Sequence, residues 1–177
     1  MKVLIIYFSQ TGNTKKIESA IYEEVSLSNE AVLNKLDDVD PDSLNAYDQV
    51  FIGTPIHAGT IAKEIQDFLK KLPPMPKMRL AGFITHAATA YPKQTLEQMT
   101  QPFVDICKNN KMKYLGCFNC QGYLADFMHE AVQKMQNASD EEWREKVKRM
   151  TGHPNAKDEA DAKAFARKSL KEAPGPT

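Results

Sequence analysis

Residues 3–8, Val-Leu-Ile-Ile-Tyr-Phe, form a continuous apolar run close to the start of the chain. β-Branched and aromatic residues without polar alternation are typical of a strand that is buried on both faces of a parallel sheet. After a short polar segment, Ile17, Ile21 and Val25 recur at helical spacing, which predicts a helix over residues 13–27. A buried strand that leads directly into an amphipathic helix is the first half of a βαβ unit, so we expect an α/β protein.

The polar segment between strand and helix holds only hydroxyl, amide and glycine residues: Ser9, Gln10, Thr11, Gly12, Asn13 and Thr14. A turn from a strand into a helix directs unpaired backbone N–H groups and the positive end of the helix dipole at one point, which suits a phosphate. The same residue types also make a good turn and helix N-cap without any ligand. The segment has neither the Gly-Lys-Ser/Thr ending of a Walker loop nor the three spaced glycines of a dinucleotide site.

Strand and helix patterns alternate through the rest of the chain. Apolar runs predict strands at residues 31–36, 48–53, 79–85 and 112–118, and helical spacing predicts helices at 60–72, with Thr60 as the N-cap, and near 96–107. This alternation implies parallel βαβ units with right-handed crossovers. The mixed polarity of residues 31–36 favours an edge strand.

Residues 123–153 are more than a five-stranded fold of this kind needs. Apolar spacing predicts one helix there, and the capping box that begins at Ser139 predicts the start of a second. We expect a helical hairpin inserted before the last helix, which spans about residues 156–170 and turns Ala160, Ala164 and Phe165 inward. The hairpin carries five large apolar residues: Phe127, Met128, Met135, Trp143 and Met150. They could form a lid over a ligand or a surface for a partner, although apolar residues at helical spacing usually pack within their own protein.

Two segments at strand ends resemble the flavodoxin family. Residues 9–14 are similar to the Ser/Thr-x-Thr-Gly-x-Thr loop that binds the phosphate of FMN, and residues 53–59 are similar to the Gly-Thr/Ser-Pro-x-aromatic-x-Gly loop beside the isoalloxazine ring. The resemblance implies one flavodoxin-like domain over residues 1–177, with a doubly wound five-stranded parallel sheet of order 2-1-3-4-5. It also implies FMN held non-covalently where that strand order reverses.

The cofactor-binding residues that follow from this resemblance lie in three loops: Ser9, Gln10, Thr11, Gly12, Asn13 and Thr14; Thr54, Pro55, Ile56, His57, Ala58 and Gly59; and Thr85, His86, Ala87, Ala88 and Tyr91. His57 stands where the family often has an aromatic ring, and it could couple flavin reduction to a proton or be an exposed histidine without a role. Tyr91 could stack on the flavin or pack on the neighbouring helix, and Tyr123 is a weaker candidate. In the resembling family a backbone carbonyl of the second loop turns toward flavin N5 on reduction, and Gly59 would make that turn sterically easy.

Charge and cysteine content narrow the class of protein further. Lys and Arg number 23, and so do Asp and Glu, without a block of one sign, so neither nucleic acid nor a membrane surface is an expected partner. This balance departs from the strong acidity of electron-shuttling flavodoxins. The chain shows no signal peptide and no membrane-length apolar run, and its three cysteines favour reduced thiols in a cytoplasmic protein. Cys117 and Cys120 would lie on opposite faces of a strand, and the four histidines lack metal-ligand spacing.

We therefore expect an FMN-binding redox protein of the flavodoxin kind, whose partner is a redox protein or a small-molecule electron donor or acceptor. A two-electron FMN-dependent oxidoreductase of the NAD(P)H:quinone kind or a related type is the alternative, and neutral charge and a lid would favour it. A flavin-free interaction module on the same fold is a third hypothesis, against which the intact loop at residues 9–14 argues. A homodimer is compatible with all three.

Overall fold

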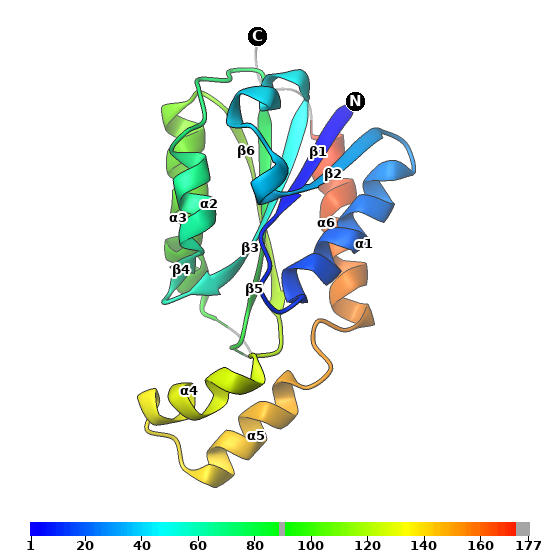
Figure 1. Ribbon diagram of the computed structural model, residues 1–177. Helices are drawn as coiled ribbons and strands as arrows, with labels where there is room; N and C mark the ends of the chain where they lie inside the picture. The colour runs from blue at the N-terminus through cyan, green and yellow to red at the C-terminus, as the bar shows by residue number, and fades with distance from the viewer. Residues whose placement is uncertain (89–90, 173–177) are drawn as a thin grey trace.

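A computed structural model describes residues 1–88 and 91–172 of the chain. Five parallel strands form a twisted sheet: β1 (Lys2–Tyr7), β2 (Glu30–Lys35), β3 (Gln49–His57), β5 (Arg79–His86) and β6 (Lys113–Gln121). Their order is β2-β1-β3-β5-β6, which confirms the predicted doubly wound order and the edge position of the second strand (Figure 1). A two-residue strand that the sequence patterns did not indicate, β4 (Thr60–Ile61), pairs antiparallel with the end of β3.

Helices cover both faces of this sheet. Helices α1 (Asn13–Ser26) and α6 (Ala156–Lys171) lie together on one face, and α2 (Lys63–Leu69) and α3 (Lys93–Asn109) lie on the other (Figure 1). Two short 3₁₀ helices, η1 (Leu36–Asp38) and η2 (Pro41–Ala46), connect β2 to β3.

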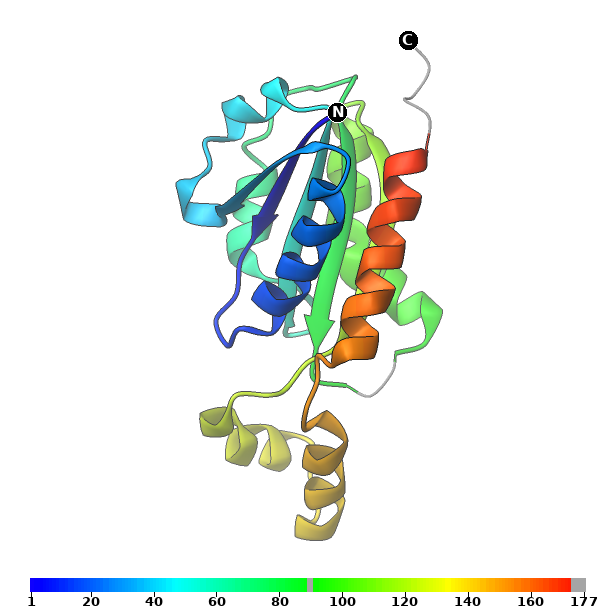
Figure 2. The same ribbon diagram turned by 90° about the vertical axis from the view of Figure 1, so that its right-hand side faces the viewer.

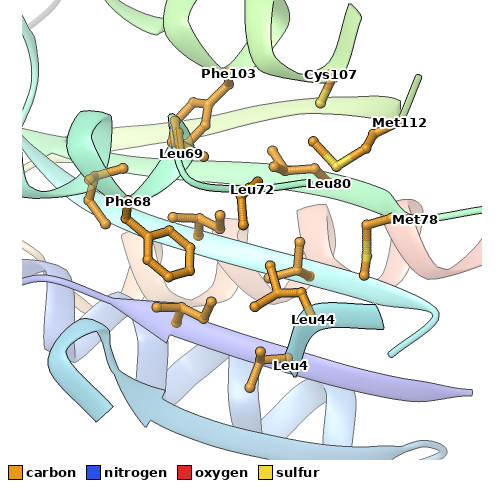
Figure 3. Close-up of a cluster of buried hydrophobic side chains, with 14 of the residues drawn as sticks. Leu4, Leu44, Phe68, Leu69, Leu72, Met78, Leu80, Phe103, Cys107 and Met112 are labelled. Carbon is orange, nitrogen blue, oxygen red and sulfur yellow. The ribbon is translucent and has the colours of Figure 1, made fainter. Parts of the chain in front are cut away.

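The position of β1 between two layers of helices explains why its apolar run is continuous. Leu4 and Ile6 belong to the hydrophobic cluster under α2 and α3, whereas Val3, Ile5 and Tyr7 belong to the cluster under α1 and α6. Figure 3 shows the first cluster, in which Leu4 lies beside Leu44, and Phe68 and Leu69 of α2 and Phe103 of α3 cover the same face. Because successive side chains of a strand point to opposite faces, a strand covered on both sides needs an apolar residue at every position.

Three local expectations were wrong. Strand β3 runs on to His57, well past the predicted end at Gly53, because its last residues pair with β4. Thr60 therefore lies in a strand, and Ala62 is the N-cap of α2, where the backbone N–H of Ala62 donates to Thr54 Oγ1 at 3.1 Å. In α6 the buried residues are Ala162, Ala166 and Ser169, while Ala160 and Ala164 are exposed.

The helical insertion projects from the carboxyl ends of the strands (Figures 1 and 2). It consists of η3 (Asp126–Met128), α4 (His129–Met135) and α5 (Asp140–Met150), and the predicted capping box at Ser139 is present. The His129 ring lies 5.4 Å from that of Tyr123 and 5.6 Å from that of Trp143, measured between ring centroids. Trp143 and Met150 are buried, although they belong to neither of the two hydrophobic clusters of the sheet.

One acidic side chain lies inside the core. Glu18 of α1 is only 1% exposed, and its Oε1 atom has no hydrogen-bond partner among the described residues. Burial raises the pKa of Glu18 from 4.5 to about 7, although Lys15 and a hydrogen bond with Ser19 act in the opposite direction. A buried carboxylate is costly because it loses its hydration, so the folded protein favours the neutral acid.

The stability of the protein should therefore fall as the pH rises from 4.5 to about 7. In this window the unfolded chain has already released the Glu18 proton while the folded chain still holds it, and the ionised side chain costs at most about 3 kcal/mol above the window. Denaturant unfolding at a series of pH values should show that Glu18→Gln removes this slope and is the more stable protein at pH 8. The matched control Glu145→Gln, at an exposed position of α5, should keep the slope. An unchanged slope in Glu18→Gln would show that another group titrates.

Candidate functional site

A cavity of about 450 Å³ lies at the carboxyl ends of the strands, between the sheet and the helical insertion. The β1–α1 segment, the end of β3 with its turn, the end of β5 and the first part of the insertion all line it: Ser9, Gln10, Thr11, Asn13, Thr14, Pro55, Ile56, His57, Ala58, Gly59, Thr85, His86, Ala87, Tyr91, Tyr123, Leu124, Ala125, Met128, Val132 and Met135. Its size is that of ordinary small-molecule sites. β1 and β3 are neighbours here, so the cavity lies where the strand order reverses, the usual ligand position in such sheets.

The β1–α1 segment presents unpaired backbone N–H groups to this cavity. Gly12 has a φ of 88° at the N-cap of α1, and its own N–H donates to Ser9 Oγ at 3.1 Å. The backbone N–H groups on either side of Gly12 donate no hydrogen bond within residues 1–88 and 91–172. They belong to Gln10, Thr11, Asn13, Thr14 and Lys15. Together with the positive end of the α1 dipole, they make an arrangement that suits an anion, and we call it the anion site.

The side chains of this segment have structural partners that the sequence did not reveal. Thr14 Oγ1 lies 2.9 Å from Thr85 Oγ1, so its hydroxyl joins α1 to β5. Asn13 Nδ2 donates to Thr11 Oγ1 at 3.1 Å and to the carbonyl oxygen of Tyr123 at 2.7 Å. The second bond connects the anion site to the beginning of the helical insertion.

The second predicted loop is the end of β3 and a two-residue turn. His57 pairs with Thr60, and the two residues between them, Ala58 and Gly59, have φ values of 48° and 82°. Positive φ at both central residues defines a type I′ turn, the turn that matches the twist of a β-hairpin. His57 lies edge-on to Phe8, with 6.5 Å between the ring centroids. The turn holds His57 and Gly59 at the cavity.

The end of β5 contributes His86 and the segment up to Tyr91, of which Thr89 and Ala90 lie outside the described residues. His86 Nδ1 lies 2.9 Å from the carbonyl oxygen of Ala88, and Nε2 lies 3.3 Å from Asn119 Oδ1. Burial lowers the pKa of His86 and so favours the neutral ring, although both hydrogen bonds act against this effect. Tyr91 packs edge-on against His86 with 4.8 Å between ring centroids. The two rings together form one wall of the cavity.

The structure brings most of the expected residues together. All of them line the cavity except Gly12, whose role is the left-handed turn, Thr54, which accepts the hydrogen bond from Ala62, and Ala88, whose carbonyl contacts His86. Three lining residues had not been expected at the site: Leu124, Ala125 and Val132. Apolar spacing had indicated the helix that carries Val132, but spacing does not tell which surface that helix faces.

The cysteines and the histidines are the other residue types of the described chain that could carry chemistry. All three cysteines are free, Cys117 and Cys120 pack in clusters on opposite faces of the sheet, and burial raises the pKa of Cys107 and Cys120 to about 12. Across the described part of the chain, no group of three or more His, Cys, Asp or Glu side chains is arranged to hold a metal ion. None of the helices described there combines the length and the apolar character that crossing a membrane requires.

Comparison with known proteins agrees with the fold. A family model described as a flavodoxin domain matches residues 4–167. The flavodoxin-like domain-containing protein BilS of Clostridioides difficile is 30% identical over 179 residues, which cover 96% of this chain and 97% of BilS. A flavodoxin from Streptococcus pneumoniae has the same fold with a TM-score of 0.68 at 14% identity, covering 98% of this chain and 100% of that one. A flavoprotein from Lactobacillus acidophilus in complex with FMN matches at a TM-score of 0.51 and 20% identity, over 67% of this chain and 92% of that one.

A parallel sheet of this order, with an anion site at the first strand–helix turn, defines a flavodoxin-like α/β protein. The match to the family model covers most of the chain, and the protein belongs to the flavodoxin domain family.

The turn at Ala58 permits a direct test of its geometry. Alanine at positive φ carries a steric cost that asparagine largely avoids, and Asn-Gly is the preferred pair in type I′ turns. Ala58→Asn should raise the free energy of unfolding by about 0.5–1 kcal/mol, measured by denaturant unfolding. The same substitution at exposed Ala160 in helix α6 should lower it by about 0.5 kcal/mol, because asparagine is the weaker helix former. A loss of stability in Ala58→Asn would contradict the type I′ assignment.

Proposed function

We propose that the protein binds FMN non-covalently and acts as a redox protein. The observation that carries this proposal is the set of unpaired N–H groups at the start of α1, which faces a cavity large enough for a cofactor. FMN ends in a single phosphate, and the cavity has one anion site. Membership of the flavodoxin domain family supports the proposal, as does the likeness to a flavoprotein that was solved with FMN.

The residues around the cavity suit the two ends of this cofactor. The unpaired backbone N–H groups of Gln10, Thr11, Asn13, Thr14 and Lys15, with the Thr11 hydroxyl beside them, would hold the phosphate. The ring system would lie between the turn at Ala58-Gly59 and the wall formed by His86 and Tyr91, where the lining is flat and largely apolar. The bound flavin would supply the electron transfer, and the protein would bind it, orient it and limit its contact with water.

Electron transfer to or from a partner is the role that family membership favours. The partner would be a redox protein or a small-molecule electron donor or acceptor.

Two-electron oxidoreductase activity is a second candidate function, and the type I′ turn at Ala58-Gly59 favours it. In the resembling family a carbonyl of this loop turns toward the flavin on reduction. Rotation of the Ala58–Gly59 peptide would convert the type I′ turn into type II′, whose first central position favours glycine. Alanine occupies that position here, so Ala58 opposes the rotation, and Gly59, at the second position, does not relieve the strain. This reverses the expectation that Gly59 makes the turn easy.

Purified protein should be yellow and should release FMN rather than FAD on denaturation, as chromatography of the released flavin would show. Thr11→Ala should weaken FMN binding by about 1–3 kcal/mol, because the phosphate loses a hydrogen bond from a hydroxyl. Thr151→Ala, which removes an exposed hydroxyl at the end of α5, is the matched control and should bind FMN normally. Thr14→Ala is a less direct test because it also removes the contact with Thr85. Colourless protein that ignores added FMN would rule out both flavin functions and favour an interaction module.

The number of electrons transferred per step decides between carrier and enzyme. If Ala58 opposes the peptide rotation, dithionite titration followed by absorbance should show less one-electron-reduced flavin in the unaltered protein than in Ala58→Gly, because glycine accepts the rotated turn. Equal amounts in both proteins would mean that the turn does not control this state. Abundant one-electron-reduced flavin in the unaltered protein, with little steady-state NAD(P)H oxidation, would favour the carrier. Rapid reduction by NAD(P)H with a quinone as acceptor would favour the enzyme.

A further inference from the structure

The cavity has two chemically different parts. The segment before α1 contributes hydroxyl, amide and backbone N–H groups to the lining, whereas the insertion contributes Leu124, Ala125 and one side of α4. No Asp, Glu, Lys or Arg is among the described residues that line either part. Apart from the anion site and the two histidines His57 and His86, the described lining thus carries no group that would compensate a charge on a ligand.

Helix α4 forms a wall that the core of the protein does not cover. Its cavity-facing stripe consists of Met128, just before the helix, Val132 and Met135. Met128 is 40% exposed and Met135 is 77% exposed, and α4 buries none of its residues. Contact between an apolar stripe and water is unfavourable, so covering this stripe with another apolar surface would lower the free energy.

This wall is held in place from both ends. Asn13 Nδ2 donates to the carbonyl oxygen of Tyr123 where the insertion begins, and Lys16 Nζ donates to that of Pro154 at 2.6 Å where it ends. Lys16 also pairs with Glu159 at 3.2 Å. Both anchors come from the first turns of α1, so the wall is attached to the same helix that forms the anion site. Figures 1 and 2 show that the insertion projects beyond the carboxyl ends of the strands rather than folding onto a face of the sheet.

We propose that the part of the cavity along the Met128–Val132–Met135 stripe binds an uncharged, planar, apolar small molecule next to the flavin, as a partner in its electron transfer. The proposal rests on the FMN site proposed above. Methionine side chains suit such a ligand because they are flexible and polarizable, and they pack well on rings of different shapes. A quinone or a comparable fused ring is the chemical class that fits these walls.

Two other occupants fit less well. A nicotinamide dinucleotide would bring a pyrophosphate, and no cation among the described lining residues faces it. A protein partner would be expected to use Phe127, which is 86% exposed and is the most accessible ring of the insertion, yet Phe127 does not line the cavity. Substitutions in the Met128–Val132–Met135 stripe and at Phe127 can therefore distinguish a ligand inside the cavity from a protein bound to the outer surface.

Equilibrium dialysis of the oxidised, FMN-loaded protein with menadione, an uncharged bicyclic quinone, tests the proposal without any redox reaction. Menadione should bind at least roughly tenfold more tightly than naphthoquinone sulfonate, its charged analogue, because the walls offer the sulfonate no partner. Val132→Thr and Met128→Gln should each weaken menadione binding roughly five- to tenfold, since each places a polar group against an apolar ligand. FMN affinity, measured by fluorescence titration of the flavin-free protein, should stay within about twofold of normal in both variants.

Two control variants change exposed apolar residues that do not line the cavity, Phe127→Ser on the insertion and Leu27→Gln at the far end of α1. Both should bind menadione normally. Failure of the FMN-loaded protein to bind menadione, or equal binding of the sulfonate, would overturn this inference and leave the FMN proposal standing. Equal loss of FMN binding in Val132→Thr would show that the stripe belongs to the flavin site, and the inference would be wrong. Protein that binds no FMN at all would overturn both proposals.

Discussion

The parallel pairing of β1 with β2 on one side and with β3 on the other is the constraint on which the rest of this structure depends. Because the chain order reverses at β1, the connections after β1 and β3 leave the sheet toward opposite faces and open a space between them. The start of α1 and the turn after β3 both border that space. The continuous apolar run of β1 makes the arrangement stable, since side chains on both of its faces are buried.

Helix α1 links the parts of the candidate site to one another. Its first turn supplies the N–H groups of the anion site, Thr14 joins it to β5, and Asn13 and Lys16 hold the two ends of the insertion. Close packing at this point also explains a glycine after β6, because a Cβ atom at Gly122 would lie 2.8 Å from the Asn13 side chain. A ligand at the start of α1 would therefore contact the element that positions the apolar wall of α4.

The two helices of the insertion use their apolar residues differently. Trp143 and Met150 of α5 are buried, as apolar residues at helical spacing usually are. Helix α4 has the same kind of spacing but keeps its apolar stripe on the cavity side. The two helices thus differ in burial, because α5 buries Trp143 and Met150 whereas α4 buries none of its residues.

The sequence by itself determined the fold class, the strand order through its family resemblance, the polar segment at the first turn and the helical character of the insertion. These features follow from local patterns, namely a continuous apolar run, helical spacing, and a capping box at Ser139. Only the tertiary structure decided where β3 ends, because pairing with a two-residue strand leaves no periodic signal. It also decided which alanines of α6 turn inward, since alanines occur on several sides of that helix. Finally, it placed the Met128–Val132–Met135 stripe on the cavity, because spacing sets which residues share a face of a helix and only contacts between distant segments set what that face meets.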